Sequence, residues 1–384
     1  MKIKNFVKLT VNTLNEYIFK ASALIRRLTK NRINMKYYAD MITMKINRLF
    51  KNEFIPNPKE HLYIEVSNIC NLRCKFCGYS KSLMNKKSIM SNEMFFDIIN
   101  RATEFGYSTF GLTPIVGEVF VDRNFINKIK FLENHPKVKN YSFFTNFTLV
   151  DKNIINELFK TKKVKEMYIS LYGHDFTSFI NVTRGNKKTY ETLLSNLHYL
   201  LKKCKEINFT LSFGLRTNRS FESLEKCESD LCEVVRNIVK ITGSPIHILK
   251  SFNTWGGLIT QKDVNGLDMI INDPLKFHKN GACSLIFYKN QVMVDGRINA
   301  CACRDIHATL QIGDIRIQSF ENVYSVRNKG YINLIEKQQQ GKFNSICEMC
   351  DFYRSIYKSY SVYEKYKKKS MSLNDFYNSL VKQH

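Results

Sequence analysis

Three cysteines, Cys70, Cys74 and Cys77, lie close together in the chain and carry its strongest chemical signal. Cysteine thiolates are the usual ligands of iron–sulfur clusters, and a [4Fe–4S] cluster has four iron corners to ligate. Three thiolates from one loop hold three corners and leave the fourth open, and an open metal position is typical of catalytic sites. Zinc is the alternative, but structural zinc sites usually pair C-x2-C with a second pair, which this triplet lacks.

The spacing C-x3-C-x2-C, with the aromatic residue Phe76 directly before the third cysteine, resembles the signature of the radical S-adenosylmethionine (SAM) superfamily. This resemblance implies that the amino and carboxylate groups of SAM chelate the fourth iron. It also implies that an electron from the cluster cleaves SAM to methionine and a 5′-deoxyadenosyl radical. Phe76, as part of the signature, is expected to contact the cofactor.

The elements that must position this loop alternate between strand and helix from residue 61 onward, which predicts a parallel α/β unit. The loop follows an apolar-rich run, 61–66, and chemistry in barrel enzymes lies at the C-terminal ends of such strands. The expected strands are 61–66, 108–113, 139–145, 165–171, 208–215 and 246–250. The expected helices are 91–105, 122–135, 151–160, 187–206 and 220–240. Six strands predict a partial (β/α)6 TIM-like barrel, the fold that the resemblance also implies.

Other expected strand ends carry motifs that resemble those of the same family. Gly117 and Glu118 stand where the family usually has Gly-Gly-Glu-Pro, with Val116 and Val119 in place of the first Gly and the Pro. The resemblance brings this motif to the SAM amino group. A turn glycine and a solvated acid are the alternative interpretation.

Three further strand-end residues complete the cofactor site that the resemblance implies. Asn146 belongs to a Thr-Asn-Gly-like motif in which Phe147 replaces the glycine. Ser170 belongs to a Ser-Leu-Asp-Gly-like motif that supplies a polar contact to SAM. Arg184 precedes Gly185, and an arginine there would pair with the SAM carboxylate.

The catalytic residues themselves remain unknown from the sequence, and two candidates line the expected substrate pocket. Arg216 follows the fifth expected strand and suits an anionic group. Trp255 lies in Asn-Thr-Trp-Gly-Gly, where two glycines beside a large aromatic suit close approach to a ligand. A plain turn with a packing tryptophan is the alternative for that stretch.

A second set of cysteines follows the expected barrel. It consists of Cys283, Cys301, Cys303, Cys347 and Cys350. A hairpin turning at Gly296 would bring the first two segments together, and Cys347 and Cys350 form a C-x2-C pair. Four thiolates from three segments would close a complete cluster site. Zinc is the rival metal here, because four cysteines with a C-x2-C pair also fit a zinc ribbon.

This second set resembles the twitch domain, the shortened form of the SPASM domain found in many radical SAM enzymes. The resemblance implies an auxiliary [4Fe–4S] cluster with Cys283, Cys301, Cys347 and Cys350 as ligands. Cys301 is preferred to Cys303 because of its spacing from Gly296, although either could be the ligand. Three remaining cysteines fall in expected helices and are interpreted as buried thiols: Cys204, Cys227 and Cys232.

Composition sets the remaining bounds. The chain of 384 residues is 44% hydrophobic, so it can bury a large core and is expected to hold two domains. Eleven cysteines without a signal peptide favour a reducing compartment, and we expect a cytoplasmic protein. The net charge is +25, but the basic residues are spread along the chain, so nucleic acid is not favoured as a partner.

The ends of the chain are basic. Residues 1–50 carry eleven Lys and Arg against two acids, and apolar residues recur there at helical spacing. We expect a helical extension packed on the barrel, with peripheral contact to an anionic membrane as the alternative. The expected domains are 1–57 (basic helical extension), 58–260 (barrel), 261–355 (auxiliary domain) and 356–384 (basic, Tyr-rich tail).

These features predict an enzyme that abstracts hydrogen from a carbohydrate-like or aminocyclitol-like small molecule, anionic or nucleotide-linked, giving dehydrogenation or epimerisation. The auxiliary cluster would relay electrons, and a flavodoxin or ferredoxin would act as external reductant. A peptide or protein maturase is the first alternative, although residues 1–57 lack the three-strand pattern of a leader-binding winged-helix module. A non-enzymatic iron–sulfur or zinc scaffold is the second, and it requires no strand ends that cradle SAM.

Overall fold

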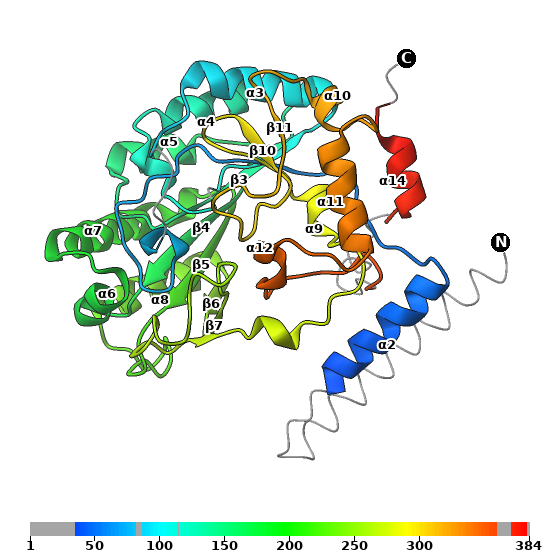
Figure 1. Cartoon of the computed structure of the whole chain (residues 1–384). Helices are drawn as coiled ribbons and strands as arrows, with labels where there is room; N and C mark the ends of the chain where they lie inside the picture. The colour runs from blue at the N-terminus through cyan, green and yellow to red at the C-terminus, as the bar shows by residue number, and fades with distance from the viewer. Residues whose placement is uncertain (1–34, 82–86, 114, 359–369, 382–384) are drawn as a thin grey trace.

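The fold is built on one nine-stranded sheet, seen in a computed structural model that describes residues 35–81, 87–113, 115–358 and 370–381 (Figure 1). Its strand order is β11-β10-β9-β1-β2-β3-β4-β5-β6. The first six strands pair in parallel with their neighbours. They are β1 (Leu62–Ile64), β2 (Thr109–Gly111), β3 (Asn140–Thr145), β4 (Val164–Tyr172), β5 (Thr210–Arg216) and β6 (Ile246–Ile248). Each overlaps an expected strand, so the predicted partial barrel is confirmed.

Helices connect these strands, as expected of a parallel sheet. They are α3 (Asn92–Phe105), α4 (Phe125–Asn134), α5 (Lys152–Phe159), α6 (Phe176–Thr183), α7 (Lys187–Lys203) and α8 (Asp230–Thr242). Three short 3₁₀ turns accompany them: η1 (Gly78–Ser80), η2 (Val119–Val121) and η3 (Cys204–Glu206). The sequence prediction started α8 ten residues too early, and it missed α6.

Capping explains both differences. The side chain of Ser229 accepts a hydrogen bond from the Cys232 amide and so begins α8 there. Asp175 and Ser178 form a capping box that starts α6. This helix has only eight residues, too few for a clear helical period in the sequence.

The C-terminal part of the chain continues the same sheet. β9 (Gln291–Val292) pairs in parallel with β1, and β10 (Arg297–Asn299) and β11 (Gln311–Asp314) add in antiparallel fashion. The hairpin between β9 and β10 is the one expected at Gly296, whose φ of +89° lies in the left-handed region that favours glycine. The remaining elements are β7 (Ser251–Phe252), β8 (Ile270–Ile271), η4 (Pro274–Lys276), α9 (Leu285–Tyr288), α10 (Phe320–Val323), α11 (Lys329–Gln339) and α12 (Ser345–Glu348).

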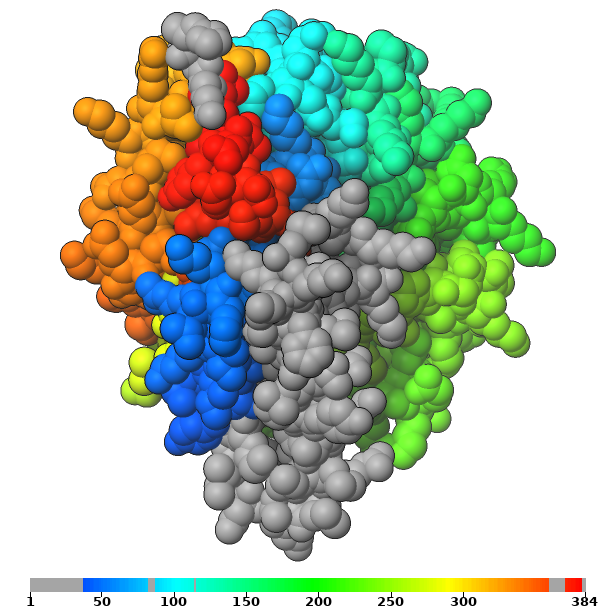
Figure 2. Space-filling view, turned by 90° about the vertical axis from the view of Figure 1, so that its right-hand side faces the viewer, coloured from blue at the N-terminus to red at the C-terminus, as the bar shows by residue number. Residues whose placement is uncertain are grey.

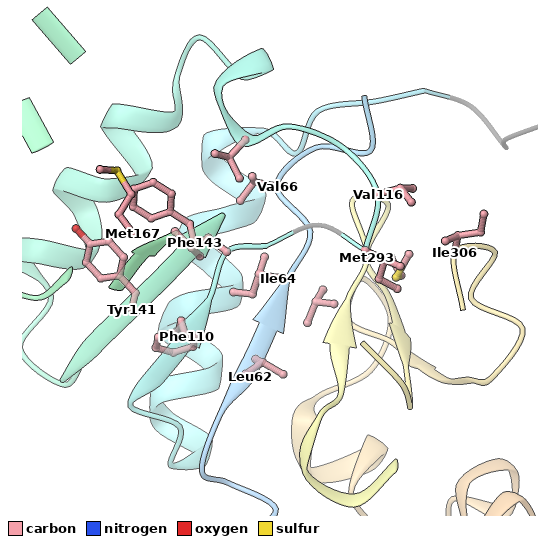
Figure 3. Close-up of a cluster of buried hydrophobic side chains, with 14 of the residues drawn as sticks. Leu62, Ile64, Val66, Phe110, Val116, Tyr141, Phe143, Met167, Met293 and Ile306 are labelled. Atoms are coloured by element: carbon pink, nitrogen blue, oxygen red, sulfur yellow. The ribbon is translucent and has the colours of Figure 1, made fainter. Parts of the chain in front are cut away.

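One hydrophobic core runs through the barrel and the C-terminal part. Figure 3 shows Ile64 and Val66, on and just after β1, with Val116 from the β2 loop and Met293 from the β9–β10 hairpin nearby. All four side chains are buried. The two cysteine-bearing parts are therefore held by shared packing as well as by the shared sheet.

The N-terminal extension is described from α2 (Met35–Leu49) onward, which confirms a helix in that part, while the predictions for residues 1–34 fall outside the described residues. Figure 2 shows α2 beside α14 (Leu373–Ser379). Asn47 donates a hydrogen bond to the Tyr357 carbonyl (2.8 Å), and the Leu373 amide donates to Glu53 (2.6 Å). Within the described part of the chain, no helix is long and apolar enough to cross a membrane.

Candidate functional site: two groups of cysteines joined by one loop

The cysteine loop that follows β1 is fixed by backbone hydrogen bonds to the end of α6 and to the loop after β2. The Arg73 and Lys75 amides donate to the carbonyls at the end of α6 (3.1 and 3.0 Å), and the Glu118 amide donates to the Ile69 carbonyl (2.8 Å). The Cys77 amide donates to the Cys74 carbonyl (3.1 Å). These contacts curl the loop over the C-terminal ends of the parallel strands, where barrel enzymes place their chemistry.

The three thiols of this loop lie close together in a buried setting. Burial raises the pKa of Cys70 to about 12 and that of Cys77 to about 11. Burial also raises the pKa of Cys74 well above the ordinary thiol value, and the charges of Cys77 and Cys70 add to that rise. Cys74 is buried and Cys70 and Cys77 are half-buried, and three neighbouring thiolates in this setting are stable only beside positive charge, which bound metal would supply. The triplet therefore fits an iron–sulfur cluster.

A cation lies beside these thiols. Arg216, the last residue of β5, lowers the pKa of Cys74 and Cys77 through its charge, against the larger effect of burial. Its guanidinium carbon lies 5.2 Å from the centre of the Phe76 ring and 4.6 Å from that of Phe252. Among the described residues, the buried Arg216 Nε has no hydrogen-bond partner. This side chain is thus placed for an anionic ligand.

Glu118 is buried, so the alternative interpretation of a solvated acid was wrong. Its Oε1 accepts a hydrogen bond from Thr145 Oγ1 (2.6 Å), and its Oε2 accepts one from the Asn146 amide (2.7 Å). Burial raises its pKa to about 7, and its charge raises the pKa of Cys70. The carboxyl therefore lies beside the cysteine loop and ties the β2 loop to the end of β3.

Asn71 is a residue of this site that the sequence reasoning missed. Its side chain accepts a hydrogen bond from Asn146 Nδ2 (2.9 Å) and donates one to Thr148 Oγ1 (2.8 Å). Asn146 is thus engaged in holding the cysteine loop to the end of β3. The next residue, Phe147, has φ of +60°, which explains why the family motif has glycine at this position.

The other expected cofactor contacts are placed differently. Ser170 is buried in β4 and forms a hydrogen bond with Tyr172. Burial raises the pKa of Tyr172, and the charges of Cys74 and Cys77 raise it further. Gly117 has φ of +136° and is half-buried. Arg184 is exposed at the C-terminal cap of α6. Ser170 therefore lies near the cysteine loop, and the SAM contacts of all three remain predictions.

Trp255 joins the cysteine loop to the C-terminal part. Its indole Nε1–H donates a hydrogen bond to the Phe76 carbonyl (2.9 Å), and its ring packs on Gly78. One residue earlier, Thr254 Oγ1 donates to the Met349 carbonyl (2.8 Å), between Cys347 and Cys350. The side chain of Trp255 is only 8% exposed and packs against the cysteine loop. Its place in the substrate pocket remains a prediction.

The second group of thiols also comes together. Burial raises the pKa of Cys283 to about 12, and the charges of Cys350 and Cys303 add to it. A hydrogen bond from Cys301 lowers the pKa of Cys303 to about 6. The charges of Cys283 and Cys350 likewise raise the pKa of Cys347. Five thiols therefore surround one site, one more than a [4Fe–4S] cluster needs, and the choice between Cys301 and Cys303 remains open.

The surroundings of this second group suit a cluster. The Phe352 amide donates to Cys350 Sγ (3.3 Å), and the Arg354 amide to Cys283 Sγ (3.5 Å). Gln338, missed by sequence reasoning, donates to Cys347 Sγ (3.5 Å) and accepts from the Cys283 amide (2.8 Å). Hydrogen bonds to the sulfurs are among the factors that tune iron–sulfur clusters.

In the parts of the chain that the structure describes, no three Cys, His, Asp or Glu side chains converge as ligands of one metal ion.

The three remaining cysteines lie apart from both groups. Cys204 and Cys232 are buried in helical positions, as expected. Cys227 is half-buried and precedes α8, so its placement in a helix was wrong. Cys232 Sγ lies 3.6 Å and Cys227 Sγ 4.0 Å from the His174 carbonyl oxygen.

A partial barrel with a buried three-thiol loop over its C-terminal strand ends defines a cluster-dependent barrel protein. Residues 64–225 match the family model for the radical SAM superfamily. Residues 64–225 thus form a radical SAM domain, and the cofactors of that superfamily are a [4Fe–4S] cluster and SAM.

The curated relatives that match share one name. GTP 3′,8-cyclase of Alkaliphilus metalliredigens is 28% identical over 127 residues, covering 33% of this chain and 38% of the relative. GTP 3′,8-cyclase of Petrotoga mobilis is 30% identical over 163 residues, covering 41% and 49%. The chain spans less than half the length of these curated relatives.

Among solved structures, the chain is similar to BtrN in complex with AdoMet and 2-DOIA, with a TM-score of 0.48, 12% identity and coverage of 78% of this chain and 96% of that one. It is also similar to Streptococcus suis SuiB bound to precursor peptide SuiA, with a TM-score of 0.49, 15% identity and coverage of 93% and 86%.

Proposed function

We propose that this chain abstracts a hydrogen atom from a carbohydrate-like or aminocyclitol-like small molecule, for dehydrogenation or epimerisation. When bound, the first cluster and SAM would supply the reductive cleavage that generates the abstracting radical. In a dehydrogenation the substrate radical would lose one proton and one electron, and a second [4Fe–4S] cluster would accept that electron. The chain's own residues connect the two cysteine groups and place a cation beside the first.

One observation supports the relay: the loop 253–257 connects the two cysteine groups directly. Trp255 donates a hydrogen bond to the carbonyl of Phe76, which precedes Cys77. Thr254 donates one to the carbonyl of Met349, which lies between Cys347 and Cys350 in the sequence. The second group has at least four thiols for four iron corners, so the protein can ligate that cluster fully. A fully ligated cluster accepts an electron but offers no iron to a substrate. This arrangement suits an oxidation better than a reaction at the auxiliary iron.

Arg216 supports a substrate or cofactor with a negative charge. It lies beside the rings of Phe76 and Phe252, which contact each other, and its Nε is buried and, in the described structure, without a hydrogen-bond partner. Such a guanidinium binds carboxylate or phosphate through paired hydrogen bonds. A phosphorylated or nucleotide-linked substrate would meet this requirement.

The experiment is a search for the substrate by its effect on SAM cleavage. The anaerobically reconstituted, dithionite-reduced chain is incubated with SAM and fractionated metabolites, and 5′-deoxyadenosine is quantified by chromatography. A small polar fraction should raise 5′-deoxyadenosine above the substrate-free rate. A product two hydrogens lighter identifies dehydrogenation, and solvent deuterium at a stereocentre identifies epimerisation.

The matched control is the variant with Cys70, Cys74 and Cys77 all changed to Ala, which should form no 5′-deoxyadenosine with any fraction. Persistent cleavage in that variant contradicts the assignment of the first site. Stimulation by peptide fractions alone contradicts the small-molecule substrate and favours a maturase.

A nucleotide cyclase is the second candidate. The curated relatives are GTP 3′,8-cyclases, and Arg216 beside the rings of Phe76 and Phe252 also suits a nucleotide with its phosphates. GTP is therefore tested as a separate arm of the same assay. If GTP raises 5′-deoxyadenosine formation and the sugar fractions do not, the cyclase candidate is favoured.

A further inference from the structure

A hollow borders the cysteine loop, and its lining includes neither Arg216 nor any cysteine of the second group. It has a volume of about 520 Å³ and is lined by residues that include Cys70, Asn71, Phe120, Arg123, Leu149 and Ile154. A second hollow of about 330 Å³ shares Asn71 and Leu149 and is also lined by Lys188. We call the two together the Asn71 groove.

The Asn71 groove reaches the cluster loop from a side that the proposed chemistry does not use. Of the three loop cysteines, only Cys70 lines it, and Arg216 does not. Its walls come from α4, α5 and the start of α7, on the left of Figure 1, whereas α11 and α12 lie toward the right. Cys70 is half-buried, so this is a place where a cluster ligand approaches the surface.

The floor of the groove is largely apolar and its rim is basic. Leu149 is 38% exposed at its centre. Arg123 lines the first hollow and Lys188 the second; both are exposed, and neither makes an ion pair among the described residues. The nearest acid in the lining, Asp122, is neutralised by the buried Lys128 at 2.5 Å. An apolar centre with uncompensated cations around it favours an acidic protein surface.

We propose that the Asn71 groove is the docking surface for an acidic one-electron carrier protein of the flavodoxin or ferredoxin type. This proposal rests on the proposed function, because it needs a cluster at Cys70, Cys74 and Cys77. With a cluster held by Cys70, Cys74 and Cys77, one electron would pass from the reduced carrier to that cluster, with no bond made or broken and no proton transferred. Small contact areas with charge steering are typical of such transient redox encounters.

The first measurement is binding, which needs no SAM chemistry. Flavodoxin is titrated into the reconstituted chain at low ionic strength and followed by calorimetry. The double variant Arg123→Glu/Lys188→Glu should bind it at least about tenfold more weakly, and added salt should weaken wild-type binding. The matched control is Lys139→Glu/Lys165→Glu, which makes the same change in net charge with exposed lysines near the starts of β3 and β4.

The second measurement compares reductants. With dithionite, the groove variant should form 5′-deoxyadenosine within about twofold of wild type, because a small reductant needs no docking surface. With reduced flavodoxin, its rate should fall at least about tenfold while the control pair stays near wild type.

The outcomes separate the two proposals. The docking surface is overturned if the groove variant binds flavodoxin and uses its electrons as well as wild type does. It is also overturned if the groove variant and the control pair lose binding and rate equally. Absence of flavodoxin binding by wild type overturns it as well. If the charge reversal impairs folding, Arg123→Gln/Lys188→Gln replaces it, with an expected weakening of about threefold. A wild-type chain that binds flavodoxin but cleaves no SAM with dithionite refutes the proposed function and leaves the surface standing.

Discussion

Replacing Trp255 by Phe tests the bridge between the two cysteine groups. The change deletes the indole N–H that donates to the Phe76 carbonyl at 2.9 Å. Both residues are less than 10% exposed, so water cannot readily replace the lost donor. An unsatisfied buried carbonyl costs about 1–3 kcal/mol. The smaller ring leaves a void against Gly78, which adds about 1 kcal/mol.

The expected cost in unfolding free energy is therefore about 2–4 kcal/mol, which for a chain of 384 residues is a fall in the thermal midpoint of roughly 2–5 °C. Calorimetry of the anaerobic, cluster-loaded chain measures it. The control is Tyr199→Phe, which removes a half-buried hydroxyl that donates to Asn156 Oδ1 at 2.9 Å. The midpoint of this control should fall by about 1 °C or less. A Trp255→Phe midpoint within the control's shift would refute the bridge.

Three further predictions concern charge and ligand support. Arg216→Met removes the cation beside Cys74 and Cys77, so the potential of the first cluster should become more negative in an EPR-monitored redox titration, and an unchanged potential would contradict that placement. Burial raises the pKa of Glu65 to about 8, so the folded chain holds a proton that the unfolded chain releases, and stability should fall as pH rises from about 4.5 to 8. Glu65→Gln should flatten this pH dependence in thermal melts. If the variant's thermal midpoint still falls with pH as steeply as that of wild type, another group causes the pH dependence. Gln338→Leu removes the donor to Cys347 Sγ and should make the second cluster lose iron faster to a chelator, whereas equal loss would show that the amide does not support it.

The strands of the barrel were predictable because each combines an apolar run with turn residues at both ends. The loop cysteines were predictable because their ligand spacing is contained in eight consecutive residues. Asn71 and Gln338 were not, since neutral amides have no diagnostic spacing and their partners are far away in sequence, as with Asn71 and Thr148. The burial of Glu118 depends on Thr145 and Asn146, which only the folded sheet brings to it.

Phe147 shows how structure explains a departure from the family motif. The resemblance expects glycine there, and the residue does adopt the left-handed backbone that glycine favours. The positive φ is a property of the turn after β3, so the sequence alone indicated only a mismatch. The five thiols of the second group are a similar case, because spacing favoured Cys301 and the fold brings Cys303 to the same site.

The iron and sulfide content of the anaerobically reconstituted chain tests the central claim most directly, because both cysteine groups are assigned to clusters. The account predicts about eight iron and eight sulfide per chain, four of each per cluster. The Cys70→Ala/Cys74→Ala/Cys77→Ala variant should retain about four of each. A wild-type chain with only about four iron, or with zinc in place of iron at the second group, would contradict the account.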